Sequence, residues 1–443
     1  MSSSRKAVPI RSATALVALT ALLSLAACGG TQEAGASSSG GGGEIKTGQG
    51  VDAQSKTITI GNLVPLTTPT SVLGIPATAA YEAYFKSVND RGGIDGWKVK
   101  IETRDTQYNT SVHVQAFNEI KSNVVMVTST GTPTTQAILP QLTQMKMVAQ
   151  PYSLATIWGN YPVLAPIGTP AGIQALNQIS YQVENNGAKN KKFGVLYQND
   201  DFGQDSAFGY HAAVDALHLK SVAEATYKNG DANFTAQVQQ LQQAGAEVIW
   251  CGCNVGAIPT IVSTAYSQGY KPIWMHDSLS HSPTQFSSNG KADGTLTAAA
   301  QPLADTTWTA PFATAASQLQ STKGWDQLKA DTEKYAPEYT DYRQYYLLGY
   351  SSARIAEAIL RKAIDSKDLT LAGIYNAKNI LGEVDLQGLM PDNVTYNGKV
   401  GPPSRTTSIG RDDTTSENFL KVIEPGYVSD AAKKFDISRM PHQ

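Results

Sequence analysis

The sequence predicts an α/β fold with two lobes, in which each lobe contains a mainly parallel β-sheet flanked by helices. Segments with the pattern of strands alternate with segments of helical pattern, and the helical segments are long enough to be the crossovers of βαβ units. The alternation pauses and begins again after Ala171, which indicates two sheets. A chain of 443 residues, without an N-terminal leader, is still long enough for two such lobes.

The first run of elements begins with a strand at 56–64, where isoleucines alternate with polar residues. The helix that follows should end at Gly92 and Gly93, because glycine readily adopts the positive φ of a helix C-terminus. The segment 123–130 is an apolar run typical of a buried strand. The other elements expected in this run are strands at 97–103 and 145–150 and helices at 77–91, 112–120 and 134–142.

The second run has the same rhythm. Its clearest helix carries Phe234, Val238, Leu241 and Ala244 on one face, and a strand follows it directly. The expected helices are 172–188, 203–217, 233–246 and 257–269, and the expected strands are 191–198, 221–227, 247–252 and 271–276. Beyond them we expect a weakly patterned helical region at 306–340, a long amphipathic helix at 342–364 and an irregular tail from residue 381.

The N-terminus, residues 1–27, has the three parts of a secretory signal peptide. A basic region is followed by an apolar run at 13–27 that ends in small residues, and this run is too short to span a bilayer, which needs about 20 apolar residues. Leu25-Ala26-Ala27-Cys28 resembles the lipobox of bacterial lipoproteins, which implies that Cys28 is lipidated and becomes the first residue after cleavage. The alternative is an ordinary secreted protein with an incidental cysteine.

The segment 28–55 should be a flexible linker. It is rich in Gly, Ser, Ala and Thr and holds too few apolar residues to build a core. A coil of this length reaches roughly 28 Å, so a lipid anchor would keep the folded part near a membrane without pressing it against the surface. The formal charge is −2, and it becomes −5 without the three basic residues of the leader, which argues against nucleic acid as a partner.

Several short motifs occur together in one order. They are a turn at Pro65-Leu66-Thr67, Gly74, Asn89 with Gly92-Gly93-Ile94 and Gly96, Asp105, and the stretches LYQNDDFGQD, GDANFTAQVQQL and YYLLGYSSARIAEAI. This order resembles the type I periplasmic solute-binding proteins of ABC importers, and within them the branched-chain amino acid (leucine/isoleucine/valine) group. The resemblance covers about residues 55–400. It implies two lobes joined by three hinge crossings, with the ligand between the lobes.

The resemblance places the crossings near Pro166, Ala299 and Gly388. Lobe 1 would then comprise 56–166 and 299–388, and lobe 2 would comprise 167–298 and 389–443. In open parallel sheets, ligands bind beyond the carboxyl ends of the strands, which is consistent with a site between the lobes.

The ligand-binding residues expected from lobe 1 follow two strands. Thr132, Thr134 and Thr135 lie in a loop that matches the ligand loop of the family, and hydroxyls and backbone amides there suit a carboxylate. Thr134 could equally be a helix cap. Tyr152 and Ser153 follow the next strand. Tyr152 and Leu154 are bulkier than the small residues that the amino acid-binding group has in this segment, so the ligand can also be a more apolar or aromatic carboxylate.

Lobe 2 is expected to contribute Phe202, Asn254 and Asp277. Phe202 takes the place of an aromatic residue that the family has at the lip of the cleft, and it offers only apolar contact. Asn254 and Asp277 follow strands directly. Asp277 is the candidate partner for a ligand ammonium group, because a carboxylate out of water gains most from a cation; a solvated loop acid is the alternative.

Two other clusters were considered as sites. Cys251 and Cys253 face the same side of a strand, and we expect two buried thiols, with a structural disulfide as the alternative and a redox role as the least favoured one. His276 and His281 with Asp277 suggest a metal, but no third ligand stands at a recognised spacing. We therefore expect no metal and no cofactor.

No enzyme motif occurs in the chain: there is no G-x-S-x-G elbow, no S-x-x-K and no phosphate-binding P-loop. We expect a monomeric, extracytoplasmic, lipid-anchored solute-binding protein that delivers an amino acid or a related carboxylate to an ABC permease by hinge closure. The first alternative is a receptor subunit that reports the same kind of ligand to a membrane signalling system. The second is an extracellular hydrolase.

Overall fold

The computed structural model describes residues 44–439, except for 69, 282–286, 289–290, 293–303, 305, 312–321, 340–343 and 416–418. The chain divides into two units, Met1–Gly43 and Glu44–Gln443, and the described residues belong to the second. The expected signal peptide and Cys28 therefore lie outside the described residues. None of the helices in the described ranges combines the length and the apolar character that crossing a membrane would need.

The first sheet has five strands: β2 (Val51–Asp52), β3 (Thr57–Val64), β4 (Lys98–Asp105), β5 (Met126–Thr130) and β6 (Val148–Tyr152). The strand β3 pairs in parallel with β4 and β5, and β5 pairs in parallel with β6. Only β2 runs antiparallel, against the start of β3. The carboxyl ends of β3, β4, β5 and β6 therefore lie at one edge of this sheet.

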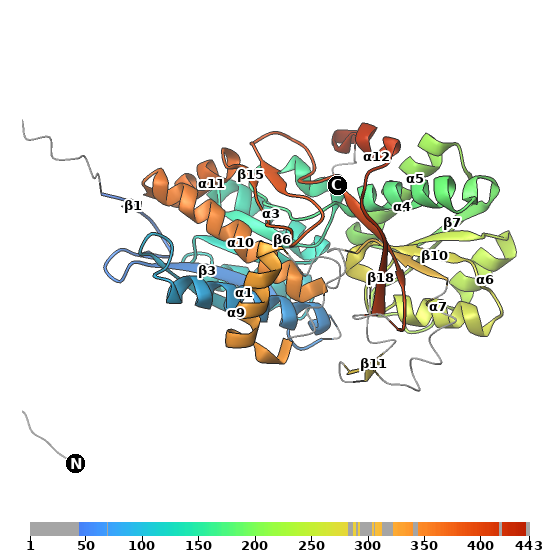
Figure 1. The fold of residues 1–443 in the computed structure, drawn as a ribbon, viewed down its shortest axis with the longest axis horizontal. Coiled ribbons are helices and arrows are strands. Elements are labelled where there is room, and N and C mark those ends of the chain that lie inside the picture. The colour runs from blue at the N-terminus through green and yellow to red at the C-terminus, as the bar shows by residue number, and fades with distance from the viewer. Residues whose placement is uncertain are drawn as a thin grey trace, which may run out of the picture. The chain divides into compact units, whose positions relative to one another are not determined.

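Helices cover both faces of the first sheet (Figure 1). One face packs against α1 (Ser71–Asp90), α9 (Lys323–Tyr335) and α10 (Gln344–Asp365), and the other against α2 (Thr110–Ile120) and α3 (Thr132–Met145). The helix α11 (Leu371–Asn379) contacts both cores, with Ile374 and Ala377 buried in the first and Leu371 packed against the second. Side chains alternate between the two cores, so Ile60 and Val64 face one and Leu63 faces the other. The helices α1 and α10 approach closely at Gly349, where a Cβ atom would lie 2.1 Å from the carbonyl oxygen of Ala77.

The second sheet has seven strands in the order β18-β17-β13-β10-β9-β7-β8. Their bounds are β7 (Lys192–Gln198), β8 (Lys220–Tyr227), β9 (Val248–Gly252), β10 (Ile273–His276), β13 (Thr307–Thr309), β17 (Thr407–Asp412) and β18 (Leu420–Tyr427). The five strands from β8 to β13 are parallel, and β17 and β18 are antiparallel additions. This half is also covered on both faces (Figure 1).

Two cores enclose the second sheet. The helices α4 (Ala171–Asn185), α5 (Asp201–Leu217) and α12 (Asp430–Lys434) pack on the face that carries Val195 and Trp250. The helices α6 (Thr235–Ala244) and α7 (Ile258–Ser267) pack on the face that carries Leu196 and Trp274. The two-lobed α/β fold and the mainly parallel sheets predicted from the sequence are therefore confirmed.

The flexible linker predicted at 28–55 is wrong for its last residues. The strand β1 (Lys46–Thr47) pairs with β14 (Asp368–Leu369), and β2 pairs with β3. Gln49 donates a hydrogen bond to the carbonyl oxygen of Val124 (3.0 Å), and Ile45 packs against the core of lobe 1. A few apolar residues and one amide suffice to fix a segment whose glycine content suggested a coil.

Two further expectations differ from the structure. The region 306–340 is not helical throughout, because β13 pairs with β10 of the second sheet before α9 begins. The tail is not irregular, since it forms β15 (Gly382–Val384), β16 (Val394–Tyr396), β17 and β18. Several of these strands are short, with three residues in each of β13, β15 and β16, and so few residues give a weak pattern in the sequence.

These pairings also move the expected hinge crossings. The crossing near Ala299 falls outside the described residues, but β13 lies in the second sheet, so residues 307–309 do not belong to lobe 1 as the sequence analysis assigned them. The antiparallel pair of β16 with β15 keeps residues 394–396 with lobe 1, beyond the crossing expected near Gly388.

Candidate functional site

The loop between β5 and α3 brings polar groups to the carboxyl edge of the first sheet. Gly131 has a φ of +100°, a conformation that L side chains rarely adopt. It directs the chain so that the first turn of α3, with its free backbone N–H groups, begins at the end of β5. The α3 N-terminus is therefore at the position where an anion would be bound in a fold of this kind.

Three buried hydroxyl groups lie where β4 and β5, the two strands on either side of β3, end. The hydroxyls of Thr106, after β4, of Thr130, the last residue of β5, and of Thr132, the first residue of α3, have no hydrogen-bond partner among the described residues. All three residues are at most 1% exposed. Because buried polar groups are nearly always paired, these hydroxyls mark a place where a bound molecule or water supplies the partner.

The other two threonines expected in this loop use their hydroxyls locally. Thr134 Oγ1 donates to the carbonyl oxygens of Thr130 and Gly131 and so holds the turn, but it does not cap α3, whose N-cap residue is Gly131. Thr135 Oγ1 lies 2.7 Å from Ser129 Oγ. Of the three residues, Thr132 is the one whose hydroxyl remains available to a ligand.

Tyr108 lies over this loop and was missed by the sequence analysis. A Cβ atom on Gly131 would lie 2.8 Å from Cε2 of the Tyr108 ring, so the ring packs directly on the glycine. Gln107 and Tyr108 both have positive φ values, 52° and 51°, which are uncommon for residues other than glycine and cluster at functional sites. No sequence motif marks such a conformation.

The turn at Pro65-Leu66-Thr67 is held against the same edge by Asp105. The carboxylate accepts hydrogen bonds from the backbone N–H of Leu66 (2.8 Å) and from Thr67 Oγ1 (2.6 Å). It also accepts from the backbone N–H of Gln107 (2.9 Å) and so fixes the start of the Tyr108 loop. Asp105 therefore positions two loops of lobe 1.

Tyr152 and Ser153, at the end of β6, are both buried. The Tyr152 ring belongs to the core of lobe 1, and burial raises the pKa of its hydroxyl. Ser153 Oγ accepts a hydrogen bond from the indole N–H of Trp158 (3.0 Å). The Tyr152 hydroxyl has no hydrogen-bond partner among the described residues, whereas the Ser153 hydroxyl is bound by Trp158.

Phe202 and Asn254 take different positions in lobe 2. Phe202 lies in the first turn of α5 and is partly exposed, which leaves its ring able to make apolar contacts. Asn254 uses its amide fully: Oδ1 accepts from the backbone N–H groups of Gly256 and Ala257, both at 3.0 Å, and Nδ2 donates to Gln198. Asn254 therefore shapes the loop after β9.

Asp277 is buried at the end of β10 and is not the solvated loop acid of the alternative interpretation. Its Oδ1 accepts from the backbone N–H of Leu279 (2.8 Å) and its Oδ2 from Ser280 Oγ (3.2 Å). Burial raises the pKa of Asp277 to about 6, against the effect of these hydrogen bonds. An ionised carboxylate has about four acceptor positions, so the group can still receive a cation.

Electrostatic contacts join the two lobes at this site. Burial, together with the carboxylates of Asp200 and Asp277, raises the pKa of the Tyr108 hydroxyl. Burial likewise raises the pKa of Tyr227, at the end of β8, and Asp200, Tyr108 and Asp277 raise it further. Tyr345 of α10 donates a hydrogen bond to the carbonyl oxygen of Leu279 (2.7 Å). The carboxyl edges of the two sheets therefore face each other.

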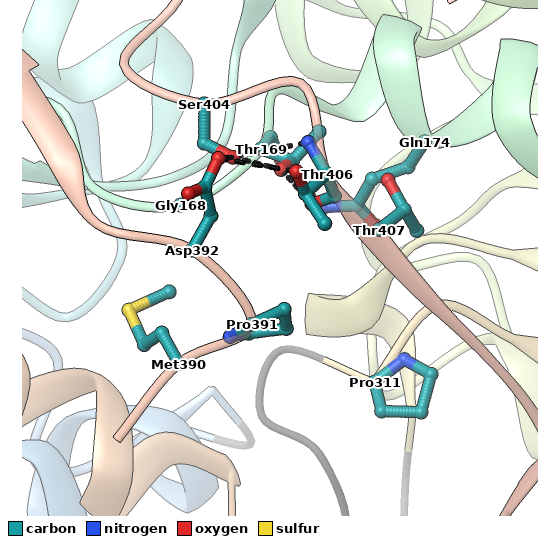
Figure 2. Close-up of a pocket in the computed structure, with 10 residues that line it drawn as sticks. All are labelled: Gly168, Thr169, Gln174, Pro311, Met390, Pro391, Asp392, Ser404, Thr406 and Thr407. Carbon is teal, nitrogen blue, oxygen red and sulfur yellow. Dashed lines mark hydrogen bonds between the residues drawn. The ribbon is translucent and has the colours of Figure 1, made fainter. Parts of the chain in front are cut away.

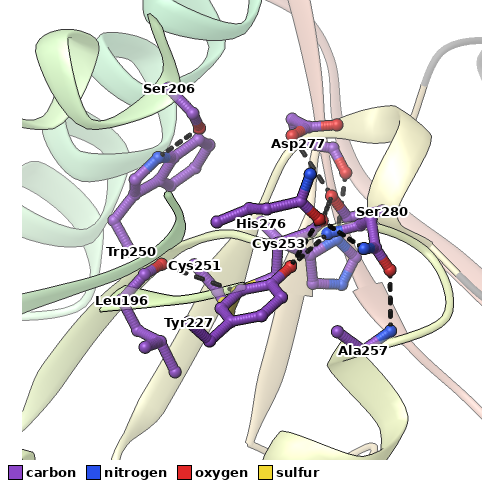
Figure 3. Close-up of a disulfide and its surroundings, with 12 residues drawn as sticks. Leu196, Ser206, Tyr227, Trp250, Cys251, Cys253, Ala257, His276, Asp277 and Ser280 are labelled. Carbon is purple, nitrogen blue, oxygen red and sulfur yellow. Dashed lines mark hydrogen bonds between the residues drawn. A yellow bond between two sulfur atoms is a disulfide. The ribbon is translucent and has the colours of Figure 1, made fainter. Parts of the chain in front are cut away.

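Cys251 and Cys253 form a disulfide, so the expectation of two free thiols is wrong and the alternative is correct. The bond lies in the core beside Trp274, and Ser280 Oγ donates a hydrogen bond to the carbonyl oxygen of Cys253 (Figure 3). Because Ser280 also contacts the Asp277 carboxylate, the disulfide is adjacent to the loop that presents Asp277.

A small cavity of about 20 Å³ lies where chain segments cross between the lobes (Figure 2). It is lined by Thr169, Asp392 and Ser404, among others, and Thr169 donates to the carbonyl oxygen of Thr406. Asp392 accepts from the hydroxyls of Ser404 (3.2 Å) and Thr406 (3.1 Å). The cavity has room for about one water molecule and is too small for an organic ligand.

Comparison with known proteins finds relatives that are solute-binding proteins. Curated relatives include a Leu/Ile/Val-binding protein homolog 3 from Brucella melitensis (29% identical, covering 44% of this chain and 54% of the relative) and a homolog 1 from Brucella suis (23% identical, 48% and 58%). The chain spans about half the length of the curated relatives it matches.

Solved structures share the fold over most of the chain. A fatty acid ABC transporter substrate-binding protein from Thermomonospora curvata has a TM-score of 0.79 at 23% identity and covers 89% of this chain and 97% of its own. A branched chain amino acid ABC transporter protein from Thermus thermophilus with bound valine has a TM-score of 0.72 at 20% identity, with coverages of 87% and 99%. These are binding proteins and not enzymes. The model of the periplasmic binding protein family matches residues 57–411, and the chain belongs to that family.

Proposed function

We propose that the protein is the lipid-anchored solute-binding component of an ABC importer and that it holds a small carboxylate between its lobes. The observation that supports this proposal most is the group of buried, unpartnered hydroxyls of Thr106, Thr130 and Thr132 at the carboxyl edge of the first sheet. They lie beside the N-terminus of α3, and Tyr108 connects this edge electrostatically to lobe 2. A ligand that pairs these groups would favour the closed arrangement of the lobes.

The chemistry of the site favours a carboxylate with an apolar or aromatic body. The hydroxyls and the N–H groups of α3 can bind the carboxylate, while Tyr108, Phe202 and Tyr152 offer apolar surface around it. The relatives whose names refer to fatty acids and to branched-chain amino acids span this chemistry. An amino acid would place its ammonium group toward Asp277.

The hinge consists of three crossings in this proposal, with lobe 1 at 44–166 and 322–396 and lobe 2 at 167–311 and 397–439. The hydrogen bonds around Thr169, Ser404 and Asp392 then lie where two of the crossings run side by side. Lipidation of Cys28 would keep a monomeric protein outside the cytoplasm and close to a permease, which raises its effective concentration there. A sensory receptor subunit is the alternative for the partner.

A thermal-shift screen over branched-chain amino acids, aromatic acids and fatty acids tests the binding function. A ligand at a hundred times its dissociation constant should stabilise the fold by about 2.7 kcal/mol. Thr132→Val should weaken binding of the best ligand about tenfold, because a hydrogen bond contributes about 1.4 kcal/mol, whereas Thr260→Val on the exposed surface of α7 should leave it unchanged. If no compound of these classes raises the melting temperature, the proposal is wrong.

A second experiment tests the anchor. Cys28→Ala should move the protein from the membrane fraction to the soluble fraction, because two acyl signals are needed for firm attachment and the substitution removes the lipidated residue. A variant that still sediments with membranes would contradict the assignment of Cys28. Co-purification with a permease, as opposed to a membrane kinase, distinguishes import from sensing.

A further inference from the structure

Two histidines and an aspartate meet inside lobe 2, on either side of the loop that carries Asp277 and on β17. His276 ends β10, His281 follows the turn η3 (Ser278–Ser280), and Asp412 ends β17. Each is at most 4% exposed. One ligand atom of each residue lies within 4.8 Å of the other two. The sequence analysis found no third ligand for the two histidines because Asp412 comes from a strand far along the chain.

The hydrogen bonds around His276 orient it as a metal ligand would be oriented. His276 Nδ1 lies 2.9 Å from the carbonyl oxygen of Asp277, and a carbonyl oxygen can only accept, so Nδ1 carries the proton. The lone pair is then on Nε2. Metal-binding histidines in proteins commonly donate their other ring N–H in this way, which fixes the tautomer and the ring orientation. Figure 3 shows His276 next to Asp277 and the disulfide.

The other two groups complete a set of nitrogen and oxygen ligands. His281 Nδ1 lies 3.1 Å from Asp412 Oδ1. The rings of His276 and His281 are nearly parallel, with an interplanar angle of 15° and centroids 6.4 Å apart. An ion pair would account for His281 and Asp412, but it gives no reason for a second buried imidazole beside them. Two imidazoles and one carboxylate are a ligand set that zinc and similar ions bind.

Thr309 adds a polar group on the same side of the sheet. It pairs in register with His276, and paired residues on neighbouring strands point to the same face. Thr309 is fully buried, and its hydroxyl has no hydrogen-bond partner among the residues that the structure describes. A metal-bound water would be a suitable partner, because a zinc ion with three protein ligands keeps a fourth position for water.

We propose that His276, His281 and Asp412 form a binding site for a divalent transition-metal ion, with zinc as the reference ion. Tetrahedral ligands at about 2.0 Å from zinc are about 3.3 Å apart, so the ligand atoms, now within 4.8 Å of one another, would approach one another by about 1.5 Å or less as the ion binds. The ion would connect the loop that carries Asp277 to β17. This inference does not depend on the proposed ligand or on the importer.

Zinc binding to the full chain tests the site. Protein treated with EDTA and dialysed is titrated with zinc chloride in a calorimeter, then desalted and analysed for metal by mass spectrometry. We expect one zinc ion per chain and a higher melting temperature. Cobalt(II) in place of zinc should give the visible absorption bands of a tetrahedral site, which a merely structural cluster would not produce.

Two variants and one control decide between this site and adventitious binding. Asp412→Asn keeps an acceptor for His281 but removes the charge, and His276→Gln removes a ligand; each should weaken zinc binding at least 100-fold. His218→Gln, at an exposed position after α5, should bind zinc as the wild type does. Circular dichroism establishes that each variant is folded. The proposal is overturned if the wild type retains no zinc and shows no cobalt bands, or if the folded His276→Gln variant still binds one ion.

Discussion

Asp205 binds the segment between β6 and α4 to α5, and its removal should cost a measurable part of the free energy of unfolding. Both carboxylate oxygens accept from the backbone N–H of Thr156 at 2.8 Å, and one also accepts from Thr156 Oγ1 at 2.9 Å. The backbone N–H of Ile157 lies 3.4 Å away. Asp205 is in α5, whereas Thr156 is in η1 (Thr156–Asn160), shortly before the first crossing.

The loss of unfolding free energy expected for Asp205→Ala follows from the backbone N–H groups that the substitution leaves without an acceptor. Two backbone N–H groups would lose their acceptor inside the protein, and each costs about 1–3 kcal/mol. Part of this cost is offset, because burial raises the pKa of Asp205 to about 7 and the variant no longer buries a carboxylate. We expect a net loss of about 3 kcal/mol. At about 2.1 cal/mol/K per residue for a folded unit of about 400 residues, the melting temperature should fall by about 4 °C.

Differential scanning calorimetry on three variants checks this reasoning. Asp215→Ala, at an exposed position on the same helix, should stay within about 0.5 kcal/mol of the wild type. Asp205→Asn should be intermediate, because its amide keeps one acceptor oxygen but sets an N–H₂ group against a donor. If Asp205→Ala is as stable as Asp215→Ala, the reasoning is wrong. The stabilisation from the hydrogen bonds of Asp205 would then equal the free-energy cost of burying its carboxylate, and packing alone would hold η1 in place.

Three other predictions concern the site, the disulfide and the pH dependence. Gly131→Ala should abolish ligand binding, measured by calorimetry, because its Cβ atom would displace Tyr108 and the backbone has a positive φ; unchanged affinity would contradict the placement of the site. Reduction of Cys251–Cys253 should destabilise the fold by about 1.5 kcal/mol in urea unfolding, since the closed loop is short, and no effect would indicate that the bond leaves the unfolded chain unconstrained. Burial lowers the pKa of His113 to about 4, so its contribution to stability is complete above its unfolded pKa near 6.5 and is lost as the pH falls through 4. His113→Gln should therefore flatten the fall in melting temperature between pH 7 and pH 4, and an unchanged slope would assign that fall to other groups.

The elements of the two parallel sheets were predictable from the sequence because their pattern is local. The buried strands 123–130 and 247–252 are apolar runs, and the helices between them carry one apolar face. The antiparallel strands β17 and β18 were not predicted, nor was β13. The strand β13 has three residues and pairs with β10 and β17, both remote in the chain, so its own sequence carries little pattern. The strand β17 pairs with β18 across a short connection, but its sequence TSIGRD has one large apolar residue and shows no apolar alternation.

The candidate site was predictable in position but not in detail. The rule that loops follow the carboxyl ends of parallel strands found Thr132 and Asp277. It could not show that the side chains of Asn254 and Thr134 form hydrogen bonds with the backbone of their own turns, because these bonds depend on the conformation of each turn. It also gave no sign of Tyr108, whose position results from two successive residues with positive φ.

The sequence alone determined the alternation of strands and helices, the family and the edge of each sheet where function is concentrated, because hydrophobic periodicity and turn residues act over a few positions. Only the tertiary structure decided which polar groups remain unpaired, that Cys251 and Cys253 are bonded, and that Asp412 joins His276 and His281. The cluster of Asp412 with the two histidines depends on distances between residues that are remote in the chain, and packing of the sheets and helices fixes such distances. The Cys251–Cys253 bond and the unpaired groups depend on how the backbone turns at the end of each strand, which the sequence pattern does not specify.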